Sequence, residues 1–283
     1  MTTLDFTPKP AFTGPGGPVG FLELEITREC QARCQHCYSN SGPAAGSGAM
    51  TAGDWRAVIA QAGAHPDITT VQFIGGEPTQ HPEFAGLVRH ALDVGLGVAI
   101  YTNLIEVTPA LWELYEDDRV RLSASWYSAD RAEHDRILGY PGAYVATWAN
   151  LRSAVRRGIE VKVGIVRVLA DQDVDGAVAQ LTEIGITDYN IDDARPVGRA
   201  LGRGQATTVD DLCGMCGRGR AAIDTNGQLM PCVLGRAFTA GNVRDTPLAE
   251  LLAGERWAQI VAAIPGKADV CNPADSNDCD PSR

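Results

Sequence analysis

The sequence is short of positive charge. It contains 24 Lys and Arg residues against 35 Asp and Glu residues, which gives a formal net charge of -11. This balance argues against nucleic acid and anionic membrane surfaces as partners, because both attract basic proteins. Long apolar runs are also missing, since the longest one falls far short of the roughly 20 residues that span a bilayer. We therefore expect no nucleic-acid partner and no membrane association.

The N-terminal segment lacks the hydrophobic stretch of a signal peptide. Residues 1–20 read MTTLDFTPKPAFTGPGGPVG and contain no apolar h-region. We predict a flexible N-terminal lead-in and a cytoplasmic protein. The sequence shows no internal repeat. What remains is a chain of 283 residues with 45% hydrophobic content, enough for one large domain and a smaller module.

Short β-branched runs alternate with amphipathic stretches in the first two thirds of the chain. The predicted strands are 21–26, 70–74, 97–101, 120–125, 160–166 and 188–192. The predicted helices are 51–63, 83–94, 108–116, 143–157 and 173–184. Strands that alternate with helices form parallel βα units with right-handed crossovers. The sequence therefore predicts an α/β fold, a partial (β/α)6 TIM-like barrel over residues 21–204.

The C-terminal third has a different character. Residues 198–212 are rich in glycine and polar side chains and are typical of a linker. Beyond them, AAIDTNGQLMPC predicts a β-hairpin with a type I′ turn at Asn226-Gly227. A helix should follow, with Thr246 as its cap and Pro247 at its first position. We expect residues 205–283 to form a small unit that metal stabilises, and the barrel core to be independent of it.

The eight cysteines fall into two groups with no cysteine between them, Cys30, Cys34 and Cys37 in one and Cys213, Cys216, Cys232, Cys271 and Cys279 in the other. In a reducing cytosol such clusters are metal ligands rather than disulfides. The first group could bind zinc, with His36 as fourth ligand, or three irons of a [4Fe–4S] cluster whose fourth iron stays open. No second zinc knuckle lies nearby, which favours the open cluster.

The first group, with the spacing C-x3-C-x2-C after the first predicted strand, resembles the signature of the radical S-adenosylmethionine (SAM) enzymes. Further segments resemble motifs of the same superfamily: Gly75-Gly76-Glu77-Pro78, Asn103, Ser125 and Arg195. The segment SASWYSADRAEHD is one residue longer than the usual fourth-strand motif. All of these positions lie at or just past the C-terminal ends of different predicted strands, which form the active-site face of a parallel barrel.

The resemblance implies a role for each of these residues. Cys30, Cys34 and Cys37 would hold a [4Fe–4S] cluster, and SAM would bind its open iron. The SAM contacts would come from Gly75, Gly76, Glu77 and Pro78 at the ammonium group, Asn103 at the ribose, and Ser125 and Arg195 at the carboxylate. His36 would pack near SAM, where the superfamily usually has an aromatic residue. The reaction would be reductive cleavage of SAM to a 5′-deoxyadenosyl radical, which abstracts hydrogen from a substrate.

The second cysteine group resembles the start of the SPASM extension, or of the shorter twitch domain, which adds auxiliary [4Fe–4S] clusters to radical SAM barrels. A zinc ribbon has a similar spacing. Because the group follows a barrel of this kind, we predict one auxiliary [4Fe–4S] cluster. Its ligands would be Cys213, Cys216, Cys232 and either Cys271 or Cys279.

The resemblance is strongest to maturases of ribosomally synthesised peptides (RiPPs), which crosslink or epimerise residues. It implies a precursor peptide and an electron donor such as flavodoxin or ferredoxin as partners. No domain-sized segment precedes residue 21, so a peptide-recognition protein would be separate. One alternative is a dehydrogenase of a small molecule such as an amino sugar alcohol. Another is a non-catalytic iron–sulfur sensor or carrier, against which the SAM-contact motifs argue.

Overall fold

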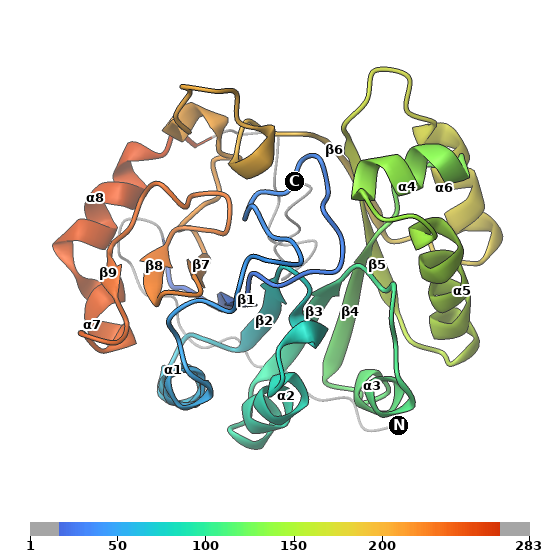
Figure 1. Cartoon of the computed structure of the whole chain (residues 1–283). Helices are drawn as coiled ribbons and strands as arrows, with labels where there is room; N and C mark the ends of the chain where they lie inside the picture. Colours follow the sequence, from blue (N-terminus) through green and yellow to red (C-terminus); the bar gives the residue numbers. More distant parts are fainter. Residues whose placement is uncertain (1–16, 267–283) are drawn as a thin grey trace.

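A computed structural model describes residues 17–266 of the chain (Figure 1). Within them, nine strands form one sheet in the order β6-β5-β4-β3-β2-β1-β7-β8-β9. The predicted ligands Cys271 and Cys279, and most of the predicted lead-in, lie outside the described residues. Inside this range, no helix combines the length and the apolarity that crossing a bilayer requires.

The first six strands are parallel neighbours in chain order, as expected of a partial barrel. They are β1 (Phe21–Thr27), β2 (Thr70–Gly75), β3 (Gly97–Thr102), β4 (Val120–Ser125), β5 (Val161–Arg167) and β6 (Tyr189–Asp193). The helices between them are α1 (Ala52–Ala64), α2 (Phe84–Asp93), α3 (Pro109–Tyr115), α4 (Arg131–Leu138), α5 (Ala143–Arg156) and α6 (Val174–Glu183). The α/β class and the parallel sheet are confirmed.

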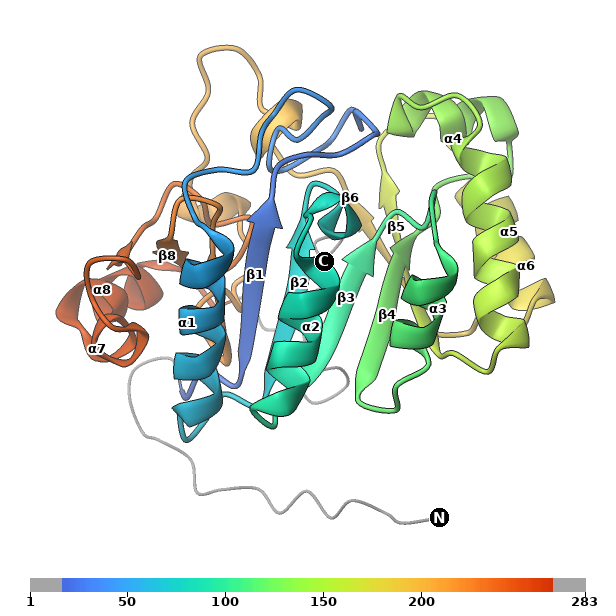
Figure 2. The same ribbon diagram turned by 60° about the horizontal axis from the view of Figure 1, so that its bottom comes forward.

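The two faces of the sheet differ in polarity. On β1, Leu22, Leu24 and Ile26 belong to the main apolar core, while Glu23 and Glu25 alternate with them and so point to the opposite face. Figure 2 shows α1, α2 and α3 covering the outer face of the sheet. The helices thus shield the apolar face, and the opposite face carries the buried carboxylates of β1.

Helix α4 was not predicted as a helix. It buries only His134, Ile137 and Leu138, so its apolar pattern is too sparse to stand out in the sequence. Its ends nevertheless follow ordinary rules. The Asp130 side chain accepts a hydrogen bond from the Glu133 N–H at the start, and Gly139 closes the helix with φ of 61°.

The C-terminal part extends the same sheet rather than forming a separate one. Strand β7 (Arg220–Ile223) pairs in parallel with β1, and β8 (Gln228–Met230) and β9 (Gly241–Asn242) follow in antiparallel pairs. Ala221 and Ile223 share the main core with the barrel. The expectation of an independent barrel core is therefore wrong, because β7 covers the edge that β1 would otherwise leave open.

Two local predictions in this part are corrected. The turn between β7 and β8 is not type I′, because Gly227 has a positive φ of 86° whereas Asn226 does not. Instead, Asp224 Oδ1 accepts hydrogen bonds from the N–H groups of Asn226 and Gln228, both at 2.9 Å. The single predicted helix is split at Gly254 into α7 (Leu248–Ala253) and α8 (Glu255–Ala263), and its cap is Pro247 rather than Thr246.

Candidate active site

The C-terminal ends of the parallel strands surround a cavity whose empty volume, including the part open to solvent, is about 950 Å³. Most of the predicted site residues line this cavity together: Cys30, Cys34, His36, Cys37, Gly75, Gly76, Asn103, Ser125 and Arg195. Glu77 and Pro78 are not among the lining residues. The sequence therefore located the cavity, although not every side chain that faces it.

The three thiols of the first group lie in surroundings that fit an iron–sulfur cluster. The Ser41 N–H donates to Cys37 Sγ at 3.3 Å, and Asn103 Nδ2 donates to Cys30 Sγ at 3.7 Å. Burial, with the Glu77 carboxylate adding to it, raises the pKa of the Cys30 thiol to about 12. Such a thiol becomes a thiolate when a metal binds it. The donors then stabilise the sulfur charge.

A zinc site needs ligands that converge on one metal ion. Among residues 17–266, no three His, Cys, Asp or Glu side chains form a group that could hold one metal ion. A cubane binds each thiolate to a different iron, so its ligands need not converge on one point. His36 Nε2 instead meets the Tyr127 hydroxyl at 3.2 Å. Burial first, and then the nearby Arg199, lower the pKa of His36 to about 4, so the ring is neutral at pH 7.

Arg199 holds the three-cysteine loop in place by hydrogen bonds. No sequence motif pointed to this residue. It lies in η2 (Gly198–Ala200), and its guanidinium donates to the carbonyl oxygens of Cys34 and Ser41. Its backbone N–H donates to the Cys37 carbonyl at 2.8 Å. A Cβ on Gly198 would lie 2.2 Å from the Tyr38 carbonyl oxygen, so a larger residue would push the segment away. The predicted linker thus begins with a structural contact to the site.

The glycines after β2 allow two backbones to meet. A Cβ on Gly75 would lie 2.2 Å from the Thr27 carbonyl oxygen, and one on Gly76 would lie 2.2 Å from the Glu29 carbonyl oxygen. The Gly76 N–H donates to the Thr27 carbonyl at 2.7 Å. Only glycine permits this approach. The segment is therefore anchored to the chain that leads into the three-cysteine loop.

Glu77 is buried behind the cavity wall, with 1% of its surface exposed. Its Oε1 accepts hydrogen bonds from the hydroxyls of Thr79 and Thr102, both at 2.8 Å, and its Oε2 accepts the Asn103 N–H at 2.8 Å. Burial raises the pKa of this carboxyl, and the hydrogen bonds oppose that rise. The carboxylate thus joins the end of β2 to Asn103. Its predicted contact with the SAM ammonium group stays a prediction.

Two further predicted residues, Arg195 and Ser125, line the cavity and also contact neighbouring side chains. Arg195 forms an ion pair with Asp192, whose Oδ2 lies 2.8 Å from Nη2 and 3.2 Å from Nε. Ser125 Oγ lies 3.5 Å from the Tyr101 hydroxyl. Both side chains line the cavity, so the fourth and sixth strands contribute as expected. Their contact with a carboxylate stays a prediction.

The second cysteine group is enclosed. Cys213, Cys216 and Cys232 are all buried, and none of them lines the cavity. Their sulfurs are close together, with Sγ–Sγ distances of 3.9 Å between Cys213 and Cys216 and 2.7 Å between Cys216 and Cys232. Three buried cysteines gathered at one place, none of them in a disulfide, are the type of residue that holds a second cluster.

Comparison with known proteins places the chain in a family. Residues 24–179 match the model of the radical SAM superfamily, and residues 213–280 match the SPASM iron–sulfur cluster-binding domain. A PqqA peptide cyclase from Bradyrhizobium diazoefficiens is 34% identical over 140 residues, which cover 47% of this chain and 36% of the cyclase. An AdoMet-dependent heme synthase from Nitratidesulfovibrio vulgaris is 27% identical over 185 residues, which cover 64% of this chain and 50% of the synthase.

A solved structure has the same fold. SuiB of Streptococcus suis, bound to its precursor peptide SuiA, superposes with a TM-score of 0.70 at 16% identity, covering 85% of this chain and 66% of SuiB. The chain spans half or less of the length of the two relatives. The superfamily match nevertheless covers more than half of this sequence. The chain therefore belongs to the radical SAM superfamily, and [4Fe–4S] clusters and SAM are its cofactors.

Proposed function

We propose that the chain is a maturase that modifies a ribosomally synthesised precursor peptide, by crosslinking or epimerising its residues. The observation that carries this proposal is the cavity at which the three-cysteine loop meets the ends of the parallel strands. The chain is similar in sequence to a peptide cyclase and shares its fold with an enzyme bound to a precursor peptide. Both findings support a peptide as the substrate.

Cys30, Cys34 and Cys37 would hold the [4Fe–4S] cluster that binds SAM. When bound, the two cofactors supply a 5′-deoxyadenosyl radical that takes a hydrogen atom from the substrate. The protein's part is to bind and orient. Gly75 and Gly76 present backbone groups to the amino end of SAM. Asn103, whose backbone N–H donates to Glu77, presents its side-chain amide to the ribose. Ser125 and Arg195 offer donors to the carboxylate.

The remaining cavity wall is mostly apolar. It includes Ile74, Leu138, Val166, Val197 and Leu234. Such side chains exclude water from the cavity, which strengthens the electrostatic contacts inside it. His36 and Tyr127 hold each other by a hydrogen bond across one side of the cavity. We assign no residue as the acid or base of the reaction.

Cys213, Cys216 and Cys232, with Cys271 or Cys279, would hold the auxiliary cluster in a unit that spans residues 205–283, next to a barrel over residues 21–204. Because these thiols do not line the cavity, we assign the auxiliary cluster to electron transfer rather than to SAM. In a crosslinking reaction it would accept the electron that the substrate radical loses when the new bond forms. A flavodoxin or ferredoxin would supply the electron for SAM cleavage, and a separate protein would recognise the peptide in the cytoplasm.

A small-molecule substrate is the second candidate, and the similarity to a heme synthase is the observation that favours it. A non-catalytic carrier or sensor is disfavoured, because such a protein has no need for a cavity formed by SAM-contact residues.

The test is turnover of a peptide. Anaerobically reconstituted protein is incubated with SAM, dithionite and a short peptide encoded next to its gene, and the peptide is analysed by mass spectrometry in deuterated buffer. A crosslink removes two hydrogens, whereas epimerisation introduces one deuterium. Protein with Cys34→Ala serves as the control. If the parent forms 5′-deoxyadenosine but leaves every adjacent peptide unchanged while it converts a small molecule, the peptide proposal is wrong.

A further inference from the structure

Two carboxylates on β1 are fully buried. Glu23 and Glu25 each have 0% of their surface exposed, and both alternate with the apolar side chains of β1. Removing a carboxylate from water is costly unless it gains a charged or hydrogen-bonding partner. The identity of those partners is therefore informative.

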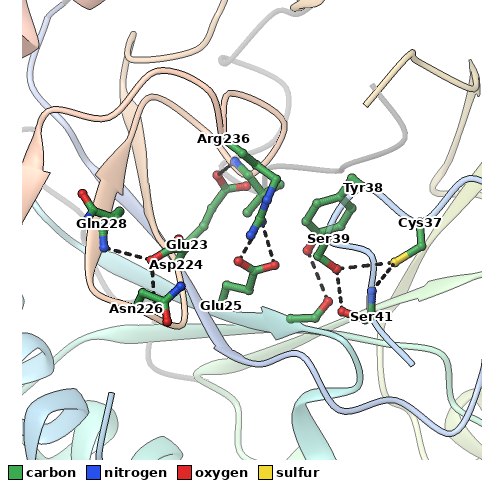
Figure 3. A network of polar contacts seen from close by, with 12 residues as sticks. Glu23, Glu25, Cys37, Tyr38, Ser39, Ser41, Asp224, Asn226, Gln228 and Arg236 are labelled. Atoms are coloured by element: carbon green, nitrogen blue, oxygen red, sulfur yellow. Dashed lines mark hydrogen bonds and ion pairs between the residues drawn. The ribbon is translucent and has the colours of Figure 1, made fainter. Parts of the chain in front are cut away.

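Both carboxylates are contacted by the segment that follows Cys232 (Figure 3). Arg236 Nη1 donates to Glu25 Oε1 at 2.8 Å and to Oε2 at 2.7 Å. The Val233 N–H donates to Glu23 Oε2 at 3.1 Å. Residues 233–236 are thus held at both ends by one strand of the barrel, more than 200 residues earlier in the sequence.

This segment connects the two halves of the site. At its start, Cys232 belongs to the enclosed thiol group, with Sγ 2.7 Å from that of Cys216. In its middle, Leu234 lines the cavity that also contains Cys30, Cys34 and Cys37. The segment therefore carries a predicted cluster ligand and a piece of the reaction cavity wall, within three residues of each other.

The ion pair also lies beside the first thiol group. Figure 3 shows Glu25 and Arg236 next to Tyr38, the residue that follows Cys37. The Tyr38 hydroxyl donates to the Gly75 carbonyl at 3.4 Å. Glu25 and Arg236 are thus packed between the segments that bear Cys37 and Cys232.

Stability alone is a weak reason for such a pair. Buried ion pairs often contribute no more than apolar residues of the same size, because desolvation offsets the attraction. A buried ion pair in which one donor nitrogen meets both carboxylate oxygens does fix direction and distance. The contacts therefore suit a part of the molecule whose exact placement matters.

We propose that Glu25 and Arg236 are positioning residues that hold the segment bearing Cys232 against the SAM cavity, with Leu234 as part of its wall. The proposal rests on the proposed function only for what happens in that cavity. It goes beyond that function because it names the contact that couples the auxiliary cluster to the reaction cavity. That contact joins β1 to the C-terminal unit.

The first experiment needs no turnover. Hydrogen–deuterium exchange of the reconstituted protein is followed in peptides that cover residues 231–238, for the parent, Glu25→Gln and Arg236→Met. We expect exchange at Val233 and Leu234 to become at least tenfold faster in both variants. Arg157→Met is the matched control, because it breaks an exposed ion pair with Glu116. Unchanged exchange at residues 231–238 in Glu25→Gln and Arg236→Met would overturn the proposal.

The second experiment uses rescue and a spectroscopic signal. A single nitrogen of Arg236 contacts both Glu25 oxygens, so Arg236→Lys should restore slow exchange and the parent EPR spectrum of the auxiliary cluster, while Arg236→Met should shift that spectrum. If Lys and Met behave alike, charge pairing does not position the segment. Should Glu25→Gln fold poorly, the double variant Glu25→Met/Arg236→Leu removes both charges, and we expect it to fold with fast exchange at residues 231–238.

Activity separates this proposal from the proposed function. In Arg236→Met we expect SAM cleavage to continue while modified peptide falls at least tenfold per 5′-deoxyadenosine formed. If the parent modifies no peptide, the proposed function fails, and the exchange result still decides the positioning role. If the parent modifies its peptide and the exchange in the variants does not change, only the positioning role fails.

Discussion

The two cysteine groups of this chain differ in what surrounds their sulfur atoms. Cys30, Cys34 and Cys37 all line the open cavity, and polar donors approach the sulfurs of Cys30 and Cys37. Cys213, Cys216 and Cys232 lie among apolar side chains such as Leu212, Met230 and Ile260. A cofactor that must bind a small molecule needs the first arrangement, and one that only exchanges electrons suits the second.

The two groups are also held differently. The first is fixed by contacts from other strand ends, through Arg199 and through Glu77 with Asn103. The second is fixed by the sheet and by α8, because Arg218 donates to the carbonyls of Gly214 and Ile264 at 2.6 and 3.0 Å. Variants in the two regions should therefore separate SAM cleavage from product formation.

The largest effect is expected from Cys34→Ala. The variant should lose SAM cleavage completely, because the cluster that binds SAM would lose one of its three proposed ligands. It should keep about four irons per chain in the enclosed group. Iron content and 5′-deoxyadenosine formation under dithionite provide the measurement. Parent-rate formation of 5′-deoxyadenosine would show that the two groups have been assigned the wrong way round or that neither binds SAM.

Cys216→Ser should have the opposite pattern. About four irons should be lost, SAM cleavage should continue, and modified peptide should disappear. Label from deuterated peptide should still reach 5′-deoxyadenosine, because hydrogen abstraction precedes electron removal. Loss of label transfer together with SAM cleavage, with the first cluster intact, would make the enclosed cluster structural or substrate-binding. Since Cys216 packs in one apolar cluster with Ile74 of β2, the melting temperature should fall as well.

Arg199→Met tests how the open group is held. Removing its donors to the Cys34 and Ser41 carbonyls should weaken the SAM-binding cluster by roughly 10–100-fold, as is usual for groups that support metal ligands. The rate of iron release to a chelator measures this. Arg203→Met, at an exposed position, is the control. Equal release rates in the two variants would remove Arg199 from the account.

Glu77→Gln should have the smallest effect of the four. An amide nitrogen cannot accept a hydrogen bond, so at least one of the donors from Thr79, Thr102 or Asn103 loses its acceptor, at a cost of about 1–3 kcal/mol. The KM for SAM should rise because Asn103 is displaced. Denaturant unfolding and SAM titration provide the measurements. Glu83→Gln, in an exposed ion pair with Arg56, should change stability by less than about 0.5 kcal/mol.

Much of the fold could be predicted because its signals are local. The bounds of β1 to β6 lie within one residue of the predicted ranges, since each is a short β-branched run between turns. The position of the site followed from topology, because parallel strands bring their ends to one face. Gly75 and Gly76 were found through their resemblance to a superfamily motif, and the structure adds that glycine is needed there because two backbones touch.

The remainder depends on contacts between distant parts of the chain. Arg199 donates to backbone carbonyls more than 150 residues away. Every residue has a backbone carbonyl, so no residue type in the sequence indicates this contact. The pairing of β7 with β1 and the shared core could not be inferred from the sequence. The Gly-rich segment 198–212, which precedes β7, is typical of a linker between separate units. The pairing of Glu25 with Arg236 is of the same kind, since neither residue carries a motif.

The most direct test of the central claim is the response of the two clusters to SAM. Reduced, reconstituted protein is examined by EPR with and without SAM, for the parent, Cys34→Ala and Cys216→Ser. The account predicts that SAM changes one signal in the parent, that Cys216→Ser keeps this change, and that Cys34→Ala loses it. A change that persists in Cys34→Ala but vanishes in Cys216→Ser would contradict the assignment of the open site to the three-cysteine loop.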